Sequence, residues 1–274
     1  ATAQALTSVA GALAGAVEGT AGLGRLFVFD NGTSMISELN PATGAVIRSF
    51  ASPVAVAGGI DFGMATTPTS LLVAGISSAA IYELNPDTGA VIRTIGTTGT
   101  SVSGLAYRNG EIFVRSDSNN TVTVRDYTTG AVLRSFTIPT SSESLAAGYD
   151  YLYATNGTTL LVLDPATGAA VSSRSLGGNG IEGLGVIGNE LFVASLGTVT
   201  VFDRTTFAPL RTWSGFVDLE GIGADGGTAN ISDYYRVTLS AGQAFRATTS
   251  TPADGAGEFV NQFNPKFFLY NSAG

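Results

Sequence analysis

The sequence NPDTGAVIR, residues 85–93, recurs along the chain in five related copies. The other four are NPATGAVIR at 40–48, DYTTGAVLR at 126–134, DPATGAAV at 164–171 and DRTTFAPLR at 203–211. The fifth residue of each copy lies at position 44, 89, 130, 168 or 207, so successive copies are 45, 41, 38 and 39 residues apart. A fixed period of about 40 residues is typical of a repeat architecture.

Each copy has the chemistry of a tight turn between two strands. An Asn or Asp side chain hydrogen-bonds to the backbone of a turn, proline fixes φ, and glycine adopts positive φ without strain. Apolar and β-branched residues precede the turn at 81–84 and follow it at 90–93. Two such strands joined by a short loop that contains glycine predict a β-hairpin.

The residues between the hairpins complete four short strands in every period. In the second unit, the predicted strands are 71–74, 81–84, 90–95 and 104–107. The last of these belongs to a set of short segments, mostly with glycine, at 59–62, 104–107, 144–147, 183–186 and 221–224. Four antiparallel strands for every 40 residues or so form the blade of a β-propeller.

Units of the form LNPATGAVIRSF … GLA … LFV resemble those of bacterial extracellular β-propellers of the PQQ-like, YVTN and NHL superfamily. The resemblance covers residues 25–225 and implies an all-β fold at the cell surface or outside the cell. It implies no particular activity, because propellers host lyases, hydrolases, dehydrogenases and binding platforms alike.

The place of the glycine-containing strand within each period sets the number of blades. Glycine allows close approach at the crowded axis of a propeller, so we expect this strand to be innermost. The strand at 221–224 then completes the blade that begins at 26–29, and this pairing closes a ring of five blades. The alternative is a six-bladed ring, in which residues 9–13 form an inner strand and the C-terminal tail fills part of the sixth blade.

Two segments lie outside the repeat. The predicted organisation is an N-terminal apolar arm at 1–22, a propeller at 23–225 and a C-terminal segment at 226–274. The C-terminal segment contains DYYRVTLSAG at 233–242 and PKFFLYNSAG at 265–274. It resembles the first half of a bacterial pre-peptidase C-terminal domain, a small secreted β-sandwich. Because that family continues for several more strands, we expect an incomplete sandwich with unpaired strand edges.

Composition excludes several kinds of site and partner. The 274 residues are 44% hydrophobic and 12% charged and include 36 glycines, a balance that suits short strands and tight turns rather than disorder. The net charge is −8 and Lys266 is the sole lysine, which argues against nucleic acid as a partner. The absence of histidine and cysteine excludes disulfides, thiolate sites, Ser-His-Asp triads and histidine metal ligands. No stretch of sequence predicts a membrane span.

One set of positions predicts a candidate site at the axis. The residues that precede the inner-strand glycine or its equivalent are Gly58, Ser103, Glu143, Glu182 and Glu220. In a five-bladed ring these positions face one another, so three neighbouring carboxylates would share one channel mouth. We interpret them as a wet, acidic mouth, with a bound Ca²⁺ ion as the functional alternative, since every available ligand is an oxygen. A glycosidase-like carboxylate pair is a third interpretation, for which the sequence shows no substrate pocket.

Two other residue sets recur on the surface. Asn31, Asn119, Asn156 and Asn230 begin Asn-x-Ser/Thr sequons and are glycosylation candidates, with glycans as an associated partner class. Arg48, Arg93, Arg134 and Arg211 occupy one position of the repeat, which we interpret as solvated charges on the outer strands.

Two classes of function fit the sequence. The first is a non-catalytic, extracellular structural protein that polymerises, in which the arm at 1–17 adds a strand to the incomplete sandwich of the next copy. Such a contact joins two different surfaces, so repetition gives a head-to-tail filament. The alternative is a secreted propeller enzyme of the lyase or glycoside hydrolase type, or a carbohydrate- or protein-binding module of a longer chain whose further strands complete the sandwich. A lyase of the virginiamycin type is disfavoured, because the chemistry of that family depends on histidine.

Overall fold

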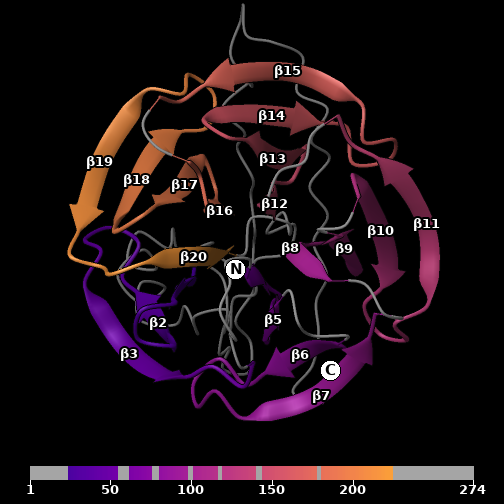
Figure 1. Cartoon of the computed structure of the whole chain (residues 1–274), viewed down its shortest axis with the longest axis horizontal. Coiled ribbons are helices and arrows are strands. Elements are labelled where there is room, and N and C mark those ends of the chain that lie inside the picture. Colours follow the sequence, from indigo (N-terminus) through magenta and orange to yellow (C-terminus); the bar gives the residue numbers. More distant parts are fainter. Residues whose placement is uncertain are drawn as a thin grey trace, which may run out of the picture. The chain divides into compact units, whose positions relative to one another are not determined.

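The structure, a computed structural model, describes residues 24–54, 62–75, 80–97, 101–116, 119–139, 144–177 and 180–224. In these ranges the elements are strands, which form five sheets of four strands each around a common axis (Figure 1). The predicted all-β, five-bladed propeller is therefore confirmed. The terminal segments at 1–22 and 226–274, on which the predicted arm and sandwich fall, lie outside the described residues.

Each blade is an antiparallel sheet, and its strands are named here from the axis outward. Blade one contains β20 (Leu219–Ala224), β1 (Leu26–Asp30), β2 (Met35–Leu39) and β3 (Val46–Ala51). Blade two contains β4 (Phe62–Thr66), β5 (Leu71–Gly75), β6 (Ala80–Leu84) and β7 (Val91–Gly96). Blade three contains β8 (Val102–Arg108), β9 (Glu111–Ser116), β10 (Thr121–Asp126) and β11 (Val132–Thr137).

The last two blades follow the same order. Blade four contains β12 (Leu145–Ala147), β13 (Leu152–Asn156), β14 (Thr159–Leu163) and β15 (Ala170–Ser175). Blade five contains β16 (Gly183–Ile187), β17 (Glu190–Ser195), β18 (Thr198–Asp203) and β19 (Pro209–Ser214). The outermost strands β3, β7, β11, β15 and β19 form the circumference of the ring in Figure 1.

The ring closes where the last strand of the described chain meets the first. Strand β20 pairs antiparallel with β1, with Leu26 opposite Ala224 and Val28 opposite Ile222. Each inner strand also contacts the inner strand of the next blade, and β20 in turn contacts both β4 and β16. Five blades therefore complete the circle as predicted, and the six-bladed alternative is wrong.

The hydrophobic core is divided into five clusters, one between each pair of neighbouring blades. Successive side chains of a strand point to opposite faces of its sheet, so β1 contributes Leu26 and Val28 to one cluster and Phe27 and Phe29 to the next. Between blades one and two, for example, the rings of Phe29 and Phe62 stack with centroids 3.9 Å apart. Burial of both faces explains why β1 and β5 are continuous apolar runs rather than alternating ones.

The repeated turn has the predicted geometry. In blade two, the side-chain oxygen of Asn85 accepts hydrogen bonds from the backbone N–H groups of Asp87 at 2.9 Å and Thr88 at 3.1 Å. Gly89 has φ of +73° and donates its N–H to the carbonyl of Asn85 at 2.8 Å. The turn ends in a bulge, because Leu84 lies opposite Val91 whereas Glu83 lies opposite Arg93, which leaves Ile92 as an additional residue.

The inner strand of blade two differs from its predicted bounds. The sequence places it at 59–62, whereas the structure places it at Phe62–Thr66. Gly63, rather than Gly59, takes the position of close contact, since a Cβ atom on it would lie 3.0 Å from the carbonyl carbon of Gly104. Residues 55–61 lie outside the described residues.

Candidate functional site

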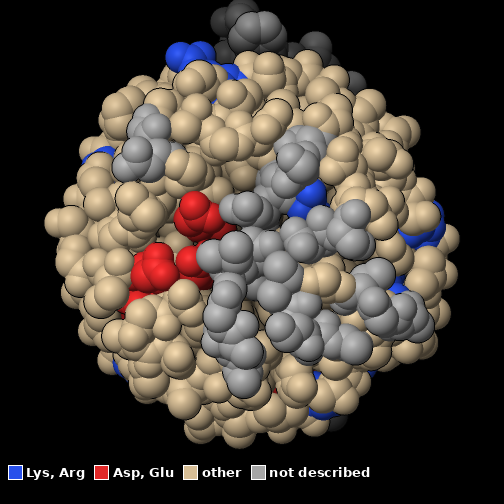
Figure 2. All heavy atoms as spheres, viewed as in Figure 1, with Lys and Arg blue, Asp and Glu red and all other residues tan. Residues whose placement is uncertain are grey.

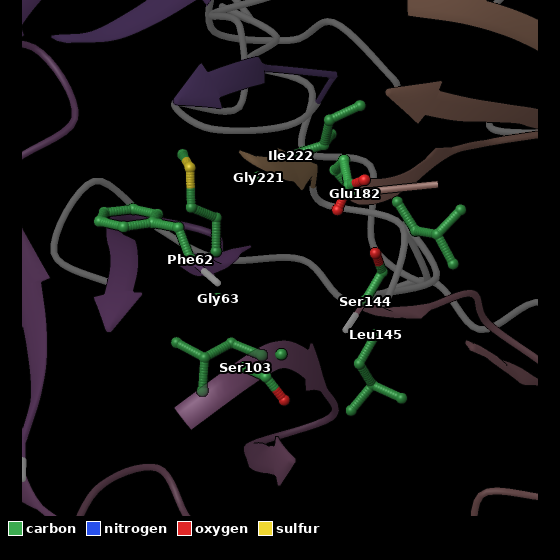
Figure 3. Close-up of a pocket in the computed structure, with 13 residues that line it drawn as sticks. Phe62, Gly63, Ser103, Ser144, Leu145, Glu182, Gly221 and Ile222 are labelled. Carbon is green, nitrogen blue, oxygen red and sulfur yellow. The ribbon is translucent and has the colours of Figure 1, made fainter. Parts of the chain in front are cut away.

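The axis is lined by residues at or just before the beginning of the inner strands. Four of them surround a small pocket (Figure 3): Phe62 directly before Gly63, Ser103 before Gly104, Ser144 before Leu145 and Glu182 before Gly183. Gly221 also lines this pocket. The glycines let neighbouring backbones touch there. A Cβ atom on Gly221 would lie 2.6 Å from the carbonyl oxygen of Phe62. This close packing leaves a cavity of only about 10 Å³, the space of a single water molecule.

Polar groups at the axis are held by their neighbours. The guanidinium of Arg115 donates from Nη1 to the hydroxyl of Ser103 at 2.7 Å, and each residue is 1% exposed. The hydroxyl of Ser144 donates to the carbonyl of Ile181 at 3.4 Å. The first contact lies within blade three and the second joins blade four to blade five, and both leave the hydroxyls engaged with protein rather than directed at a ligand.

The predicted axial set is brought together in part. Ser103 and Glu182 line the pocket, and Glu220 is buried directly before Gly221, which also lines it. Gly58 and Glu143 lie outside the described residues. Across the described ranges, no three Asp or Glu side chains are grouped so that they could hold a metal ion. The calcium site therefore stays a prediction.

The acidic character of this region is visible on one face of the molecule. Figure 2 shows acidic side chains gathered beside the centre of that face, whereas most of its basic side chains lie around the circumference. On this face, the acidic side chains therefore lie closer to the centre than most of the basic ones do.

The described sequons occupy equivalent turns. Each lies at the connection between the second and third strands of a blade: Asn31 in the turn of blade one, Asn119 in the turn of blade three, and Asn156 as the last residue before the turn of blade four. Asn119 and Asn156 are exposed, whereas the amide nitrogen of Asn31 donates to a carboxylate oxygen of Asp218 at 3.0 Å. Asn230 lies outside the described residues. Glycosylation of these residues stays a prediction.

The arginines that recur on the outer strands join neighbouring blades. Arg134 forms an ion pair with Glu111 of its own blade at 2.6 Å and donates to the carbonyl of Pro165 in blade four at 3.3 Å. Arg211 crosses the closure of the ring and donates to the carbonyl of Pro41 in blade one at 2.6 Å. Equivalent contacts are made by Arg48 to Asp87 and by Arg93 to Thr128. These arginines therefore lie on the outer strands and stay partly exposed, as predicted, but they also make contacts between blades that the sequence did not predict.

A second contact accompanies each of these arginines. Two residues further along the outer strand, an aromatic or branched side chain packs on the turn glycine of the next blade. A Cβ atom on Gly44 would lie 2.9 Å from Cδ1 of Trp213, and one on Gly89 would lie 2.6 Å from Cγ of Phe50. The same packing joins Ile95 to Gly130 and Phe136 to Gly168. We call the arginine contact and the glycine contact together the inter-blade joint.

The joint between blades four and five has the opposite arrangement. Ser172 replaces the arginine of β15, and Arg174 takes the place of the aromatic residue. The turn glycine of blade five is in turn replaced by Phe207, which adopts φ of +56°. The guanidinium carbon of Arg174 lies 5.7 Å from the centroid of the Phe207 ring, so a cation–π contact replaces the aromatic–glycine contact.

Sequence reasoning missed the inter-blade joint, although a signal for it exists. An aromatic residue follows the arginine by two positions in Arg48-Ser49-Phe50, Arg134-Ser135-Phe136 and Arg211-Thr212-Trp213. Residues two apart on a strand share one face. The pair could therefore have been recognised as one surface directed at a common neighbour.

The outer strands also expose apolar side chains at the bulge. The additional residue of the bulge is Ile47, Ile92, Leu133, Val171 or Leu210, one in each blade, and these five are called the rim residues below. Their exposed fractions lie between 50% and 55%. Apolar residues so placed in all five blades form a feature of the whole circumference.

Comparisons with known proteins identify one matching family. The family model PQQ_2, described as outer membrane protein assembly factor BamB, matches residues 32–202. This agrees with the PQQ-like part of the resemblance seen in the sequence, whereas the match does not reach the segment that resembles a pre-peptidase C-terminal domain. No curated protein matches the chain.

Three solved structures illustrate the similarity. The glutaminyl cyclase of Myxococcus xanthus is 16% identical over 60% of this chain and 79% of its own, with a TM-score of 0.49. The WD40 domain of Neurospora crassa Pan2 is 16% identical over 72% and 67%, with a TM-score of 0.45. BamB from Moraxella catarrhalis is 18% identical over 73% and 64%, with a TM-score of 0.38. We infer no activity from similarities at this level.

Proposed function

This chain belongs to the family described as outer membrane protein assembly factor BamB, and on that premise we propose that it is a non-catalytic structural protein. Copies of it assemble into a filament or surface assembly outside the cell. The inter-blade joints and the closed ring make the propeller a rigid subunit for such an assembly. The proposal thus assigns the propeller a mechanical role rather than a chemical one.

The small size of the axial cavity among the described residues is the observation that most supports a non-catalytic role. Small-molecule sites in proteins enclose roughly 300–1,000 Å³, whereas the cavity at this axis is about 10 Å³. Its hydroxyl groups at Ser103 and Ser144 are already bonded to Arg115 and to a backbone carbonyl. The whole chain also contains neither histidine nor cysteine, so the commonest general base and the thiolate nucleophile are unavailable.

The route of assembly that we propose follows the sequence pattern of the two ends. Residues 1–17 are uncharged and rich in small residues, and the segments at 235–239 and 267–270 are rich in β-formers. An extended segment of one copy that adds a strand to the C-terminal segment of the next gives a head-to-tail filament. Both segments lie outside the described residues, so the support for this route comes from the sequence alone.

A location outside the cytoplasm is supported by two observations. The family description names an outer membrane assembly factor, which favours the cell envelope. The sequons at Asn119 and Asn156 also lie on exposed turns, where an attached glycan would be accommodated. Within the described ranges no helix has the length and hydropathy to cross a membrane.

Deletion of residues 1–20 tests the proposal. The full chain is expected to form filaments by electron microscopy and to sediment as polymers, whereas the deletion variant should remain a monomer. A chain in which residues 1–20 are shuffled is the matched control, because it keeps composition and length but loses the strand pattern. Unchanged circular dichroism would show that the propeller is intact in both variants.

The outcomes separate the two levels of the proposal. Assembly of the deletion variant to the same extent as the full chain would show that the arm is not the connecting segment. A full chain that stays monomeric at high concentration would reject the structural role and favour a binding module of a longer protein.

A further inference from the structure

The rim residues form a surface that the closed axis and the inter-blade joints do not use. Each is about half exposed, and Val46, Val91 and Val132 beside them are exposed by 57%, 48% and 56%. In blades four and five, the residues at the same place are Ala170 and Pro209, which are also exposed. Every blade therefore presents an exposed apolar pair at the start of its outermost strand.

The bulge determines how this surface can make contact. In blade one, Val46 lies opposite Leu39 and Arg48 lies opposite Glu38, so Ile47 has no partner residue on β2. A bulge interrupts the regular ladder and hinders the addition of another strand at an exposed edge. Because the same bulge recurs in all five blades, contact at this place is made by side chains rather than by backbone pairing.

Charge favours a second copy of this chain as the occupant. The chain carries a net charge of −8, so copies repel one another over most of their surface. Next to the rim residues, however, Arg48 is neutralised by Glu38 at 2.9 Å and Arg93 by Glu83 at 2.5 Å. Figure 2 also shows the acidic side chains of that face beside its centre rather than at its edge. On this face, two copies of the chain would therefore meet with less repulsion at the circumference than at the centre.

The area of the surface sets the strength of the contact. A Val, Leu or Ile side chain that is half exposed leaves roughly 50 Å² of apolar surface in water, so one blade offers about 100 Å². A stable interface buries roughly 800 Å² on each partner. One blade-to-blade contact is therefore too small to hold a free dimer, and many equivalent contacts are needed between copies that are already linked.

We propose that the rim residues form the lateral interface between copies of this chain, which holds filaments side by side. This inference rests on the proposed function, since lateral contacts of this size require subunits already connected in a row. Each contact brings the rim residue of one blade, which is Ile47, Ile92, Leu133, Val171 or Leu210, against the equivalent residue of a neighbouring copy, so different blades contact different neighbours.

Substitution of all five rim residues by threonine tests the inference in the full chain. Threonine keeps the β-branched shape that suits a strand but replaces apolar surface with a hydroxyl. The wild-type chain is expected to form bundles of filaments by electron microscopy, and the rim variant should form single filaments. The matched control replaces Tyr149 and Val217, which are exposed by 55% and 67% away from the outer strands, with serine and threonine. This control should bundle like the wild type.

Each outcome bears on one proposal or both. Bundles of the rim variant that equal those of the wild type would overturn the lateral interface while leaving the filament intact. A wild-type chain that forms no filament at all would overturn both proposals. Equal loss of bundling in the control would overturn the assignment to the rim. Binding of the wild type to phospholipid vesicles, lost in the rim variant, would identify a membrane surface as the occupant and overturn the copy-to-copy contact.

A crosslinking measurement tests the same contact without removing apolar area from the other blades. The chain contains no cysteine, so a single Leu133→Cys substitution introduces the only thiol. Mild oxidation of the assembled variant should give a disulfide-linked dimer, because equivalent residues meet across a lateral contact. Tyr149→Cys should give no dimer under the same conditions. A yield for Leu133→Cys no higher than for Tyr149→Cys would overturn the inference.

Discussion

The joint between blades five and one should be highly sensitive to one added methyl group. Gly44 has φ of +73°, and a Cβ atom on it would overlap the ring of Trp213. Left-handed backbone costs a non-glycine residue roughly 1–2 kcal/mol, and overpacking costs roughly 1–3 kcal/mol more. We therefore expect Gly44→Ala to lower the free energy of unfolding by about 2–5 kcal/mol.

A matched glycine isolates the contribution of the neighbouring blade. Gly110 has φ of +80°, but no atom would lie within 4 Å of a Cβ atom placed on it. Gly110→Ala should therefore cost only the backbone part, about 1–2 kcal/mol. In a Trp213→Ala background, Gly44→Ala should cost the same as Gly110→Ala, because the ring that it overlaps has been removed.

Equilibrium unfolding in urea, followed by far-ultraviolet circular dichroism, measures all of these variants on one scale. The method does not depend on Trp213, which is the single tryptophan of the chain. Equal losses for Gly44→Ala and Gly110→Ala in the wild-type background would refute the reasoning, since the contact across the ring closure would then contribute nothing.

Three further predictions concern other parts of the ring. Burial opposes ionisation of Glu83, but hydrogen bonds from Tyr127 and Arg93 outweigh it and lower its pKa below the ordinary 4.5. The stability from this carboxylate is present above pH 4.5 and is lost as pH falls through the folded-state pKa, so acid titrations of the melting temperature should show a shallower decline in Glu83→Gln. Arg174→Met, which removes the guanidinium and leaves the backbone of Phe207 unchanged, should lower the free energy of unfolding by about 0.5–1 kcal/mol through loss of the cation–π contact, and an unchanged urea midpoint would contradict that contact. Calcium should raise the melting temperature of the wild type more than that of Glu182→Gln, and equal shifts in thermal scans would place any bound ion elsewhere.

The turn motif and the number of blades could be predicted from the sequence because their causes are local. Asn85 and Gly89 specify the turn through their own hydrogen bonds and φ value, whatever surrounds them. The glycine at 221 identified residues 221–224 as an inner strand, and this assignment predicted the pairing of β20 with β1 that closes the ring. Both inferences needed only spacing and backbone chemistry.

The inner strand of blade two was misplaced because two glycines compete for the same role. Gly59 and Gly63 are each followed by an apolar residue, so composition does not distinguish them. Only the packing of Gly63 against Leu105 of the next blade, where a Cβ atom would lie 3.0 Å from the backbone nitrogen, selects it. That contact spans about one whole repeat and is invisible in either segment alone.

The partners of the outer arginines could not be predicted for a similar reason. Their recurrence shows that they share a position, but the partner of Arg211 is the carbonyl of Pro41, 170 residues away in the sequence. Such contacts depend on ring closure, so they cannot be inferred before the fold is known. The cation–π contact between Arg174 in blade four and Phe207 in blade five likewise could not be predicted before the two blades were known to be neighbours.

Electron microscopy of the purified full chain over a wide range of concentrations tests the structural role most directly. We expect five-bladed rings joined in rows, whose length increases with concentration and which lie side by side at high concentration. A uniform population of single, unconnected propellers at the highest concentration would contradict it.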